Sequence, residues 1–364
     1  MNEYRVVVTD LTESGNDIEL EVFGESGLPI DLVTAEETGR AGLLAATAGA
    51  HALMVQFATI DRAVIDTLTS CLVIARYGVG VDMVDVDAAT DMGIPVANVP
   101  HYCIDEVSSQ TIGFVLDLNR RTVPLAAHVR AGRWGTVPPV TPPSRLRGQV
   151  LGVVGFGAIG TEVARKARAL GLEVLAYDPF ATPAAHPGIS FVSLPQLLAQ
   201  SDYVTLHCPL TDATRGLIGA AALAQMKPSA YLLNLSRGPV VDQAALTDAL
   251  RAGVIQGAAL DVLNAEPPDP ADALLQLDNV IVTPHIASWS VEAAVELRRE
   301  VAKSVVDALQ GREPASVVNR KQLILKSRAP AAALASALEG ASSEPVEQRA
   351  LRDERRQEDR HDEA

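Results

Sequence analysis

The sequence has few cysteines, few aromatic residues and no excess of basic residues. Its three cysteines, Cys71, Cys103 and Cys208, lie far apart, and their odd number and spacing suit neither a disulfide framework nor a zinc site. We therefore expect the protein to be located in the reducing cytoplasm and to bind no metal ion. The net charge of −15 at pH 7 leaves no basic stripe to displace phosphate counterions, so we expect no direct binding to nucleic acid.

Long hydrophobic runs are also missing. The N-terminus, "MNEYRVVVTD", enters a strand-like run without the basic and apolar regions of a signal peptide, and no stretch is long and apolar enough to span a bilayer. We expect no association with membranes. Apolar residues make up 48% of the chain and charged residues 21%, which is ordinary for a soluble globular protein, and a length of 364 residues predicts two domains.

Strand-like runs alternate with helix-like runs along most of the chain, a pattern typical of α/β folds with parallel sheets. A first series of strands ends near Pro100 and comprises "YRVVVTD", "ALMVQF", "LVIARYGVG" and "IPVANVP". Residues 104–132 then predict one long helix. A second series starts at Gln149 and comprises "QVLGVVG", "EVLAYDPF", "YVTLHCPL", "YLLNLSRG", "GAALDVL" and "VIVTPHIA".

A glycine-rich motif opens the second series. Gly155, Gly157 and Gly160 form G-x-G-x-x-G between an apolar strand and an Ala-rich amphipathic helix, and the next strand ends at Asp178. In the dinucleotide-binding turn, the first glycine makes the tight turn, the second admits the pyrophosphate, and the third lets the helix pack on the strand. The N–H groups at the helix N-terminus hold phosphates. This context predicts a Rossmann domain.

Asp178 indicates which dinucleotide is bound. A carboxylate at the end of the second strand accepts hydrogen bonds from ribose hydroxyls and repels the 2′-phosphate of NADP. Pro179 supplies no compensating positive charge. We therefore expect NAD as the cofactor.

Polar side chains follow three further strands: Arg237 after "YLLNLS", Asp261 and Glu266 in "ALDVLNAEPP", and His285 in "TPHIA". The carboxyl ends of strands in a doubly wound sheet form the ligand crevice, so these groups are predicted to lie beside the nicotinamide. Taken singly, each residue could also have a role outside any active site. The arginine and the glutamate could be solvated, the aspartate could cap a turn, and the histidine could be structural.

These motifs together resemble one known family. The stretch from Tyr4 to Asn319 is similar to the D-isomer-specific 2-hydroxyacid dehydrogenases, nearest to the branch of the C-terminal binding proteins (CtBP). The motifs that carry the resemblance are "ARYGVGVDMVDVDAAT", "GIPVANVP", "GVVGFGAIG", "HCPLTDATRGLIG", "LNLSRGPVVD", "DVLNAEPP" and "TPHIA".

The resemblance implies a domain organisation. Two doubly wound parallel-sheet domains are expected, with a Rossmann NAD-binding domain inserted in a flavodoxin-like substrate domain. Residues 1–101 and 297–322 would form the substrate domain and residues 102–296 the NAD-binding domain. The charged tail, 323–364, contains no aromatic residue, which indicates disorder.

The resemblance also implies roles for individual residues. Arg237 would bind the carboxylate and carbonyl of a small 2-keto or 2-hydroxy acid, His285 would be the acid/base, and Glu266 its partner. Arg76 would face the substrate. The substrate's carboxylate would accept hydrogen bonds from the backbone N–H groups of Val79 and Gly80. Arg237 and His285 would also contact NAD. The remaining contacts would go to NAD from Thr111, Ala158, Ile159, Cys208, Pro209, Thr214, Leu235, Ser236 and Asp261.

Two functions remain open at this point. The first is an NAD-dependent dehydrogenase that interconverts a D-2-hydroxy acid and its 2-keto acid. The second is an NADH-sensing interaction protein of the CtBP type, with weak turnover. The segment from Ile104 to Trp134 resembles the family's dimer-forming segment, so we expect a homodimer. Animal corepressors have Trp three residues after the catalytic His, whereas this chain has Ser288 there and Trp289 next, which leaves the role of Trp289 open.

Overall fold

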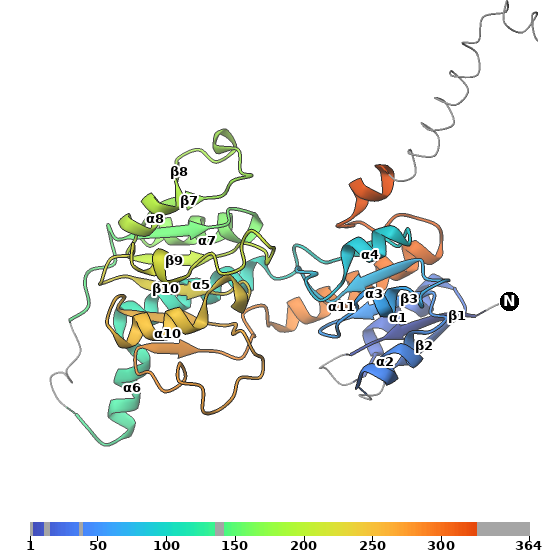
Figure 1. Cartoon of the computed structure of the whole chain (residues 1–364), viewed down its shortest axis with the longest axis horizontal. Coiled ribbons are helices and arrows are strands. Elements are labelled where there is room, and N and C mark those ends of the chain that lie inside the picture. Colours follow the sequence, from blue (N-terminus) through green and yellow to red (C-terminus); the bar gives the residue numbers. More distant parts are fainter. Residues whose placement is uncertain (1–2, 11–14, 36–38, 135–141, 326–364) are drawn as a thin grey trace, which may run out of the picture.

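The computed structural model describes residues 3–10, 15–35, 39–134 and 142–325. It contains two parallel β-sheets, each flanked by helices (Figure 1). The first sheet has the order β2-β1-β3-β4-β5, which is the flavodoxin-like order. Its strands are β1 (Tyr4–Val8), β2 (Ile30–Thr34), β3 (Ala52–Val55), β4 (Val73–Arg76) and β5 (Val96–Ala97).

Helices cover both faces of this first sheet, because alternate strand residues point to opposite sides. Val6 and Val8 pack with α1 and α11, whereas Val7 packs on the other face with α3 and α4. The helices that accompany this sheet are α1 (Asp17–Ser26), α2 (Gly39–Thr47), α3 (Arg62–Ile65), α4 (Val86–Asp91) and α11 (Val291–Leu309).

The second sheet has the order β12-β11-β10-β9-β6-β7-β8, so the chain reverses direction across the sheet between β6 and β9. This is the order of a Rossmann domain with one further strand at its edge. The two parallel-sheet domains expected from the sequence are therefore confirmed. The strands are β6 (Val150–Val154), β7 (Glu173–Tyr177), β8 (Ser190–Phe191), β9 (Tyr203–Leu206), β10 (Tyr231–Asn234), β11 (Gly257–Leu260) and β12 (Val280–Val282).

Both faces of the second sheet are likewise buried by helices. Leu233 packs on the face of α5 and α7, and Leu232 packs on the face of α8 and α10. The helical elements of this domain are α5 (Ile104–Arg120), α6 (Thr122–Arg130), α7 (Ala158–Ala169), η1 (Pro183–Ala185), α8 (Leu194–Gln200), α9 (Ala220–Leu223), η2 (Gly238–Val240) and α10 (Gln243–Arg251).

The single helix predicted over residues 104–132 is wrong. The structure has two helices, α5 and α6, and Arg121 between them has left-handed backbone angles, with φ 57°. Pro124 explains the break, because its ring and missing N–H cannot be accommodated in the interior of a continuing helix, whereas the first turn of a new helix tolerates both. The sequence interpretation also missed two short strands, β2 and β8.

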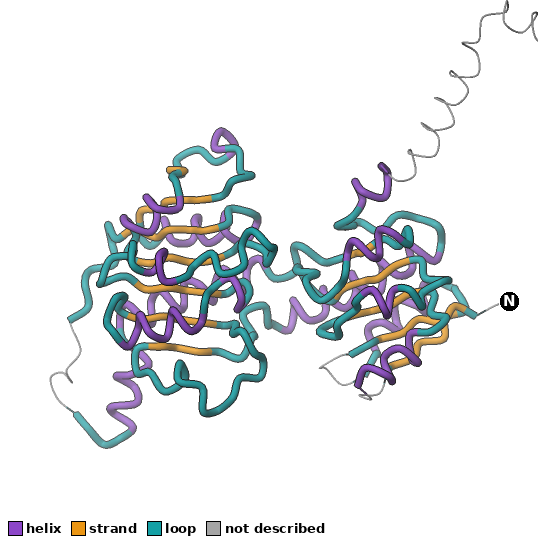
Figure 2. The backbone as a smooth tube through the Cα atoms, in the orientation of Figure 1, coloured by secondary structure: helices purple, strands orange, loops and turns teal. Residues whose placement is uncertain are grey.

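Two segments connect the domains (Figure 2). The chain passes from β5 to α5, and it returns through α11, which follows the second sheet in sequence but packs against the first. The expected boundary at 296/297 falls inside α11, and we retain the domain boundaries as a proposal. From residue 326 onward, the tail lies outside the described residues. None of the helices that the structure describes combines the length and apolar character needed to span a bilayer.

Candidate active site

The glycine-rich turn between β6 and α7 has the geometry that its sequence predicts. Gly155 has φ 89°, and a Cβ there would lie 2.6 Å from the backbone nitrogen of Cys208. A Cβ on Gly160 would lie 2.2 Å from the carbonyl oxygen of Gly155, so the helix approaches the strand more closely than any side chain allows. A Cβ on Gly157, in contrast, would meet no heavy atom within 4 Å. The turn therefore leaves open space in front of the N-terminus of α7, which begins with Ala158 and Ile159.

Asp178 follows β7 beside this open space. Its Oδ2 accepts a hydrogen bond from the N–H of Phe156 at 2.8 Å, and its Oδ1 accepts one from the N–H of Phe180 at 2.8 Å. The carboxylate is thereby held next to the glycine-rich turn. Backbone N–H groups without a side chain in front of them, with a carboxylate at the neighbouring strand end, suit a dinucleotide.

The other predicted cofactor residues lie mostly at the ends of β9 and β10. Thr214 closes the loop after β9, because its hydroxyl donates to the carbonyl of Pro209 at 2.6 Å. Cys208 is buried against Gly155, and Leu235 and Ser236 directly follow β10. Thr111 differs, because it is fully buried on α5 and its hydroxyl donates to the carbonyl of Val107 at 2.8 Å.

Asp261 organises the loop that carries His285, a function that sequence reasoning missed. Its carboxylate accepts hydrogen bonds from the N–H of Ile286 at 3.0 Å and of Ala287 at 2.9 Å, and from the hydroxyl of Thr283. Burial raises the pKa of Asp261, and these hydrogen bonds oppose that rise. The carbonyl of Asp261 also accepts the N–H of His285 at 2.8 Å.

His285 has left-handed backbone angles, with φ 55°. Such a conformation is costly for a residue other than glycine and is held where the surroundings require it. Here the contacts of Asp261 on both sides of His285 supply that restraint. The sequence shows Asp261 only as an aspartate at the end of a strand. It does not show which backbone N–H groups this aspartate binds.

Glu266 and His285 form a close pair. Nδ1 of His285 lies 2.6 Å from Oε2 of Glu266, and Oε1 of Glu266 accepts the N–H of Leu263 at 2.8 Å. Burial raises the pKa of Glu266, but the hydrogen bonds and the charges of His285 and Arg237 outweigh it and lower the pKa below its usual value. Nε2 of His285 takes part in none of the hydrogen bonds of the described residues. Phe57, from the first domain, stands edge-on to the imidazole with ring centroids 6.2 Å apart.

Arg237 reaches from the second domain to the first. Its Nε donates to Oδ1 of Asp82 at 2.9 Å, and its Nη1 donates to the carbonyl of Ser236 at 2.9 Å. A Cβ on Gly80 would lie 2.3 Å from Nη2, so glycine is needed for this approach. The neighbouring Val79 is fixed by its carbonyl, which accepts the side-chain N–H of Asn98 at 2.6 Å.

Arg76, at the end of β4, is 6% exposed. Its guanidinium lies against Gly78, where a Cβ would be 1.5 Å from Nη1. Its Nε is buried without a hydrogen-bond partner, and among the described residues the guanidinium forms neither a hydrogen bond nor an ion pair. Burial, together with the charge of Arg237, lowers the pKa of Arg76. A buried positive charge without a described partner favours binding of an anion, because the anion would compensate the charge.

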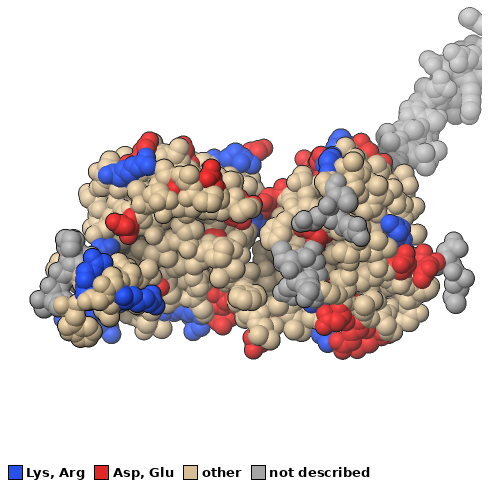
Figure 3. All heavy atoms as spheres, turned by 90° about the horizontal axis from the view of Figure 1, so that it is seen from below, with Lys and Arg blue, Asp and Glu red and all other residues tan. Residues whose placement is uncertain are grey.

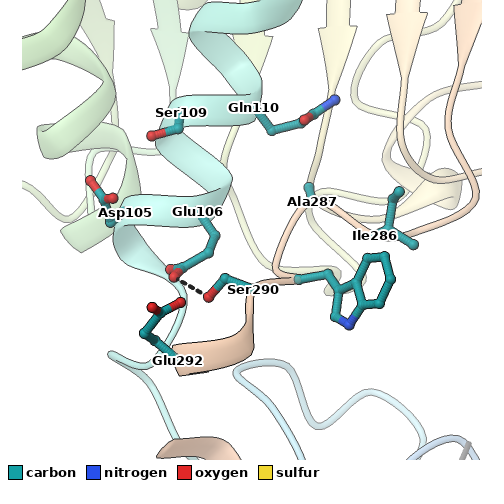
Figure 4. Close-up of a pocket in the computed structure, with 9 residues that line it drawn as sticks. Asp105, Glu106, Ser109, Gln110, Ile286, Ala287, Ser290 and Glu292 are labelled. Atoms are coloured by element: carbon teal, nitrogen blue, oxygen red, sulfur yellow. Dashed lines mark hydrogen bonds between the residues drawn. The ribbon is translucent and has the colours of Figure 1, made fainter. Parts of the chain in front are cut away.

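The molecule narrows between its two domains (Figure 3). A pocket of about 440 Å³ lies next to the site, between α5 and the segment that follows His285 (Figure 4). Ser290 and Glu106 both line it, and the hydroxyl of Ser290 donates a hydrogen bond to Oε1 of Glu106 at 2.7 Å. Trp289 also lines this pocket and is 72% exposed, so it is not part of a hydrophobic core.

The chain is similar in sequence and in structure to known proteins. Residues 112–287 match the model of the D-isomer specific 2-hydroxyacid dehydrogenase, NAD binding domain. The chain is 38% identical over 269 residues to a glyoxylate reductase of Thermofilum pendens, covering 72% of this chain and 79% of that protein.

A second relative is longer than this chain. The D-3-phosphoglycerate dehydrogenase of Archaeoglobus fulgidus is 36% identical over 303 residues, which cover 82% of this chain but only 57% of that protein. Among solved structures, the D-lactate dehydrogenase of Aquifex aeolicus, complexed with NAD and lactic acid, aligns with a TM-score of 0.78 and 27% identity. That alignment covers 86% of this chain and 98% of that one.

Proposed function

Because the chain belongs to the D-isomer specific 2-hydroxyacid dehydrogenase family, we propose that it interconverts a small 2-keto acid and its D-2-hydroxy acid with NAD as cofactor. The family predicted from the sequence motifs is confirmed by these matches. The CtBP-like branch within the family stays a prediction. The sequence predicts no particular acid, and the names of the relatives refer to different acids.

The observation that carries the proposal is the pair of His285 and Glu266. The carboxylate lies 2.6 Å from Nδ1, which leaves Nε2 for a substrate oxygen. A carboxylate on one ring nitrogen fixes the tautomer and stabilises the imidazolium, as in the catalytic pairs of hydrolases. The left-handed backbone of His285, restrained by Asp261, sets the direction of the ring.

Reduction of a keto acid requires a hydride at the carbonyl carbon and a proton at the carbonyl oxygen. The bound cofactor would supply the hydride. His285 would donate the proton from Nε2, and in the reverse reaction it would accept the proton of the hydroxyl group. Acid–base assistance of this kind typically contributes about 10²- to 10⁴-fold to the rate. Glu266 would stabilise the protonated ring before the transfer.

Two arginines would bind the substrate. The fork of Arg237 suits a carboxylate and the adjacent carbonyl oxygen, because its N–H groups are parallel and planar. Nη2 of Arg237 lies directly against Gly80, so this arginine and the N–H groups of Val79 and Gly80 are neighbours and would contact the substrate's carboxylate side by side. The unpaired charge of Arg76 would add attraction for the anion from the same side.

For the cofactor, the glycine-rich turn would receive the pyrophosphate on the free N–H groups of α7. Asp178 would accept the ribose hydroxyls and disfavour a 2′-phosphate, which supports NAD over NADP. Thr111 would contribute to the cofactor pocket through packing, because its hydroxyl is already donated to Val107.

We also propose a homodimer formed through α6. This helix has no buried residue in the described chain. Its exposed side chains include Val123, Leu125 and Val129, and Trp134 beyond it is 90% exposed. Apolar side chains gathered on one projecting helix are typical of an interface between subunits.

A screen of NADH oxidation tests the proposed function. Glyoxylate, hydroxypyruvate, pyruvate and longer or branched 2-keto acids are offered to the wild type and to His285→Asn, since asparagine tolerates the left-handed backbone. Turnover by the wild type that falls about 10²- to 10⁴-fold in the variant supports the proposal. Tight NADH binding by a wild type that reduces no 2-keto acid would favour the NADH-sensing alternative.

A further inference from the structure

The first domain contains a buried ionic network that the proposed chemistry does not use. Glu19 on α1 has an exposed fraction of 0%, Tyr77 of 2% and Arg298 on α11 of 6%. Nε of Arg298 donates to both carboxylate oxygens of Glu19, at 2.9 and 3.1 Å, and the hydroxyl of Tyr77 donates to Oε1 of Glu19 at 3.0 Å. Three segments far apart in the sequence therefore meet at one carboxylate.

The network adjoins the substrate side of the site. Tyr77 is the residue between Arg76 and Gly78, and so it opens the segment that is expected to receive the substrate. Its side chain enters the core formed with α1 and α11. Arg298 lies on α11, the helix that begins shortly after His285. One end of the network thus holds the substrate segment, and the other holds the helix that continues from the histidine loop.

Packing alone does not account for this arrangement. Burying a carboxylate and a guanidinium costs several kcal/mol in desolvation for each ion, and a well-packed apolar set at such a place is often equally stable or more stable. An ionic network fixes distances and directions that apolar contacts leave adjustable. The neighbouring backbone needs such a restraint, because Gly78 has φ 140° and contributes no side chain to the core.

We propose that Tyr77, Glu19 and Arg298 are positioning residues for substrate binding. Glu19, held by Arg298, fixes the hydroxyl of Tyr77, and Tyr77 sets the position of Arg76 and of the backbone at residues 78–80 relative to α11. This inference rests on the proposed function, in which residues 76–80 bind the keto acid. It assigns no contact with the substrate to the three residues.

The test compares Tyr77→Phe with a matched control. Tyr203 is equally buried, and its hydroxyl also has a single described side-chain partner, Asn119 at 3.1 Å, but it lies in the second domain away from residues 76–80. The hydroxyl of Tyr203 accepts its hydrogen bond from the amide of Asn119, so Tyr203→Phe loses a buried hydroxyl hydrogen bond, to a neutral partner, without touching the substrate segment.

Steady-state kinetics and thermal unfolding are measured for both variants. In Tyr77→Phe, the KM for the keto acid should rise about three- to tenfold, the equivalent of one net hydrogen bond. Its kcat and its affinity for NADH should stay within about twofold of the wild type. Tyr203→Phe should also lose thermal stability, by a smaller amount because its partner is neutral, with an unchanged KM.

A third variant distinguishes an effect on the position of residues 76–80 from an effect on the stability of the fold. Glu19→Gln retains an amide oxygen that accepts the hydroxyl of Tyr77, but it leaves the buried charge of Arg298 less well compensated. Its melting temperature should fall more than that of Tyr77→Phe, while its KM rises less. If KM instead follows the loss of stability across all three variants, or does not change in Tyr77→Phe, the network is only structural and the inference is wrong.

Hydrogen–deuterium exchange supplies a measurement that does not depend on turnover. The backbone amides of residues 76–80 should exchange faster in Tyr77→Phe than in the wild type, and at the wild-type rate in Tyr203→Phe. A wild type without keto-acid reductase activity would overturn the proposed function, and the exchange result would still decide whether the network positions this segment. Unchanged exchange in Tyr77→Phe would overturn the positioning role.

Discussion

Arg237 and Asp82 join the two domains at the candidate site. Nε of the arginine lies 2.9 Å from Oδ1 of the aspartate, and the two residues are 155 positions apart in the sequence. The contact orients the guanidinium so that Nη2 faces Gly80. If Arg237 binds the substrate as proposed, this contact with Asp82 would hold the guanidinium in place beforehand and reduce the entropy that binding must offset.

Arg237→Lys should reduce keto acids poorly although it keeps the positive charge. Lysine presents one ammonium group and loses the bidentate geometry. Loss of a buried, hydrogen-bonded charge pair costs about 2–5 kcal/mol, and the retained charge places the expected cost in the lower half of that range. The result is a drop of roughly 30- to 300-fold in kcat/KM, measured by steady-state kinetics.

The affinity of Arg237→Lys for NADH should change much less, because the glycine-rich turn and Asp178 hold the cofactor. Arg251→Lys is the control, since Arg251 is an exposed cation at the end of α10 in the same domain. Wild-type turnover in Arg237→Lys would show that the arginine is not part of the active site.

Asp178→Asn should narrow the preference for NADH over NADPH. Asparagine retains an oxygen that accepts the N–H of Phe156, so the turn keeps its shape while the negative charge is lost. Juxtaposed like charges cost several kcal/mol. We expect the ratio of kcat/KM for the two cofactors to fall by at least about tenfold. Equal use of both cofactors by the wild type would contradict the role of Asp178, and Glu173→Gln, on the same strand, is the control.

Much of this site was predictable because its groups occupy the carboxyl ends of parallel strands. In a doubly wound sheet these ends meet at one edge, so Asp178, Arg237, Asp261 and His285 could be grouped without knowledge of any contact. The glycines were equally readable, since positive φ or close approach requires glycine at Gly155 and Gly160.

Contacts between distant segments were not readable. The pairing of Asp82 with Arg237 and the approach of Phe57 to His285 depend on how the two domains meet. The break at Arg121 was missed because helix-forming residues occupy both sides of it, whereas Pro124 acts only locally on the start of α6. Asp261 was assigned to the cofactor by resemblance, and its hydrogen bonds to backbone N–H groups became visible only in the folded loop.

Val129→Asp should weaken the proposed dimer. Val129 is 49% exposed on α6, so the charge costs little in the monomer but is desolvated in an interface. The dimer dissociation constant, measured by sedimentation, should rise about tenfold or more, equivalent to about 1.4 kcal/mol. Leu20→Asp, at a residue that is 56% exposed in the first domain, should not change it. A wild type that sediments as a monomer at all concentrations would contradict the dimer.

Glu266→Gln should alter how stability depends on pH. The pKa of Glu266 is lowered in the folded protein, where the opposing effect of burial is outweighed by its contacts with His285, Leu263 and Arg237. A carboxyl group with a lowered folded-state pKa stabilises the fold above its unfolded pKa and loses this contribution as the pH falls through the folded value. The wild type should therefore exceed Glu266→Gln in unfolding free energy near neutral pH, and the difference should shrink as the pH falls below the usual glutamate value of about 4.3.

Urea denaturation at a series of pH values measures this difference. Glu296→Gln is the control, because Glu296 is exposed on α11 and its carboxylate takes part in no hydrogen bond among the described residues. Its difference from the wild type should stay small at every pH. At neutral pH, Glu266→Gln should also lose keto-acid reduction, since an amide stabilises the imidazolium far less than a carboxylate does. A stability difference for Glu266→Gln that is constant with pH would mean that its contacts do not lower the pKa of Glu266 in solution.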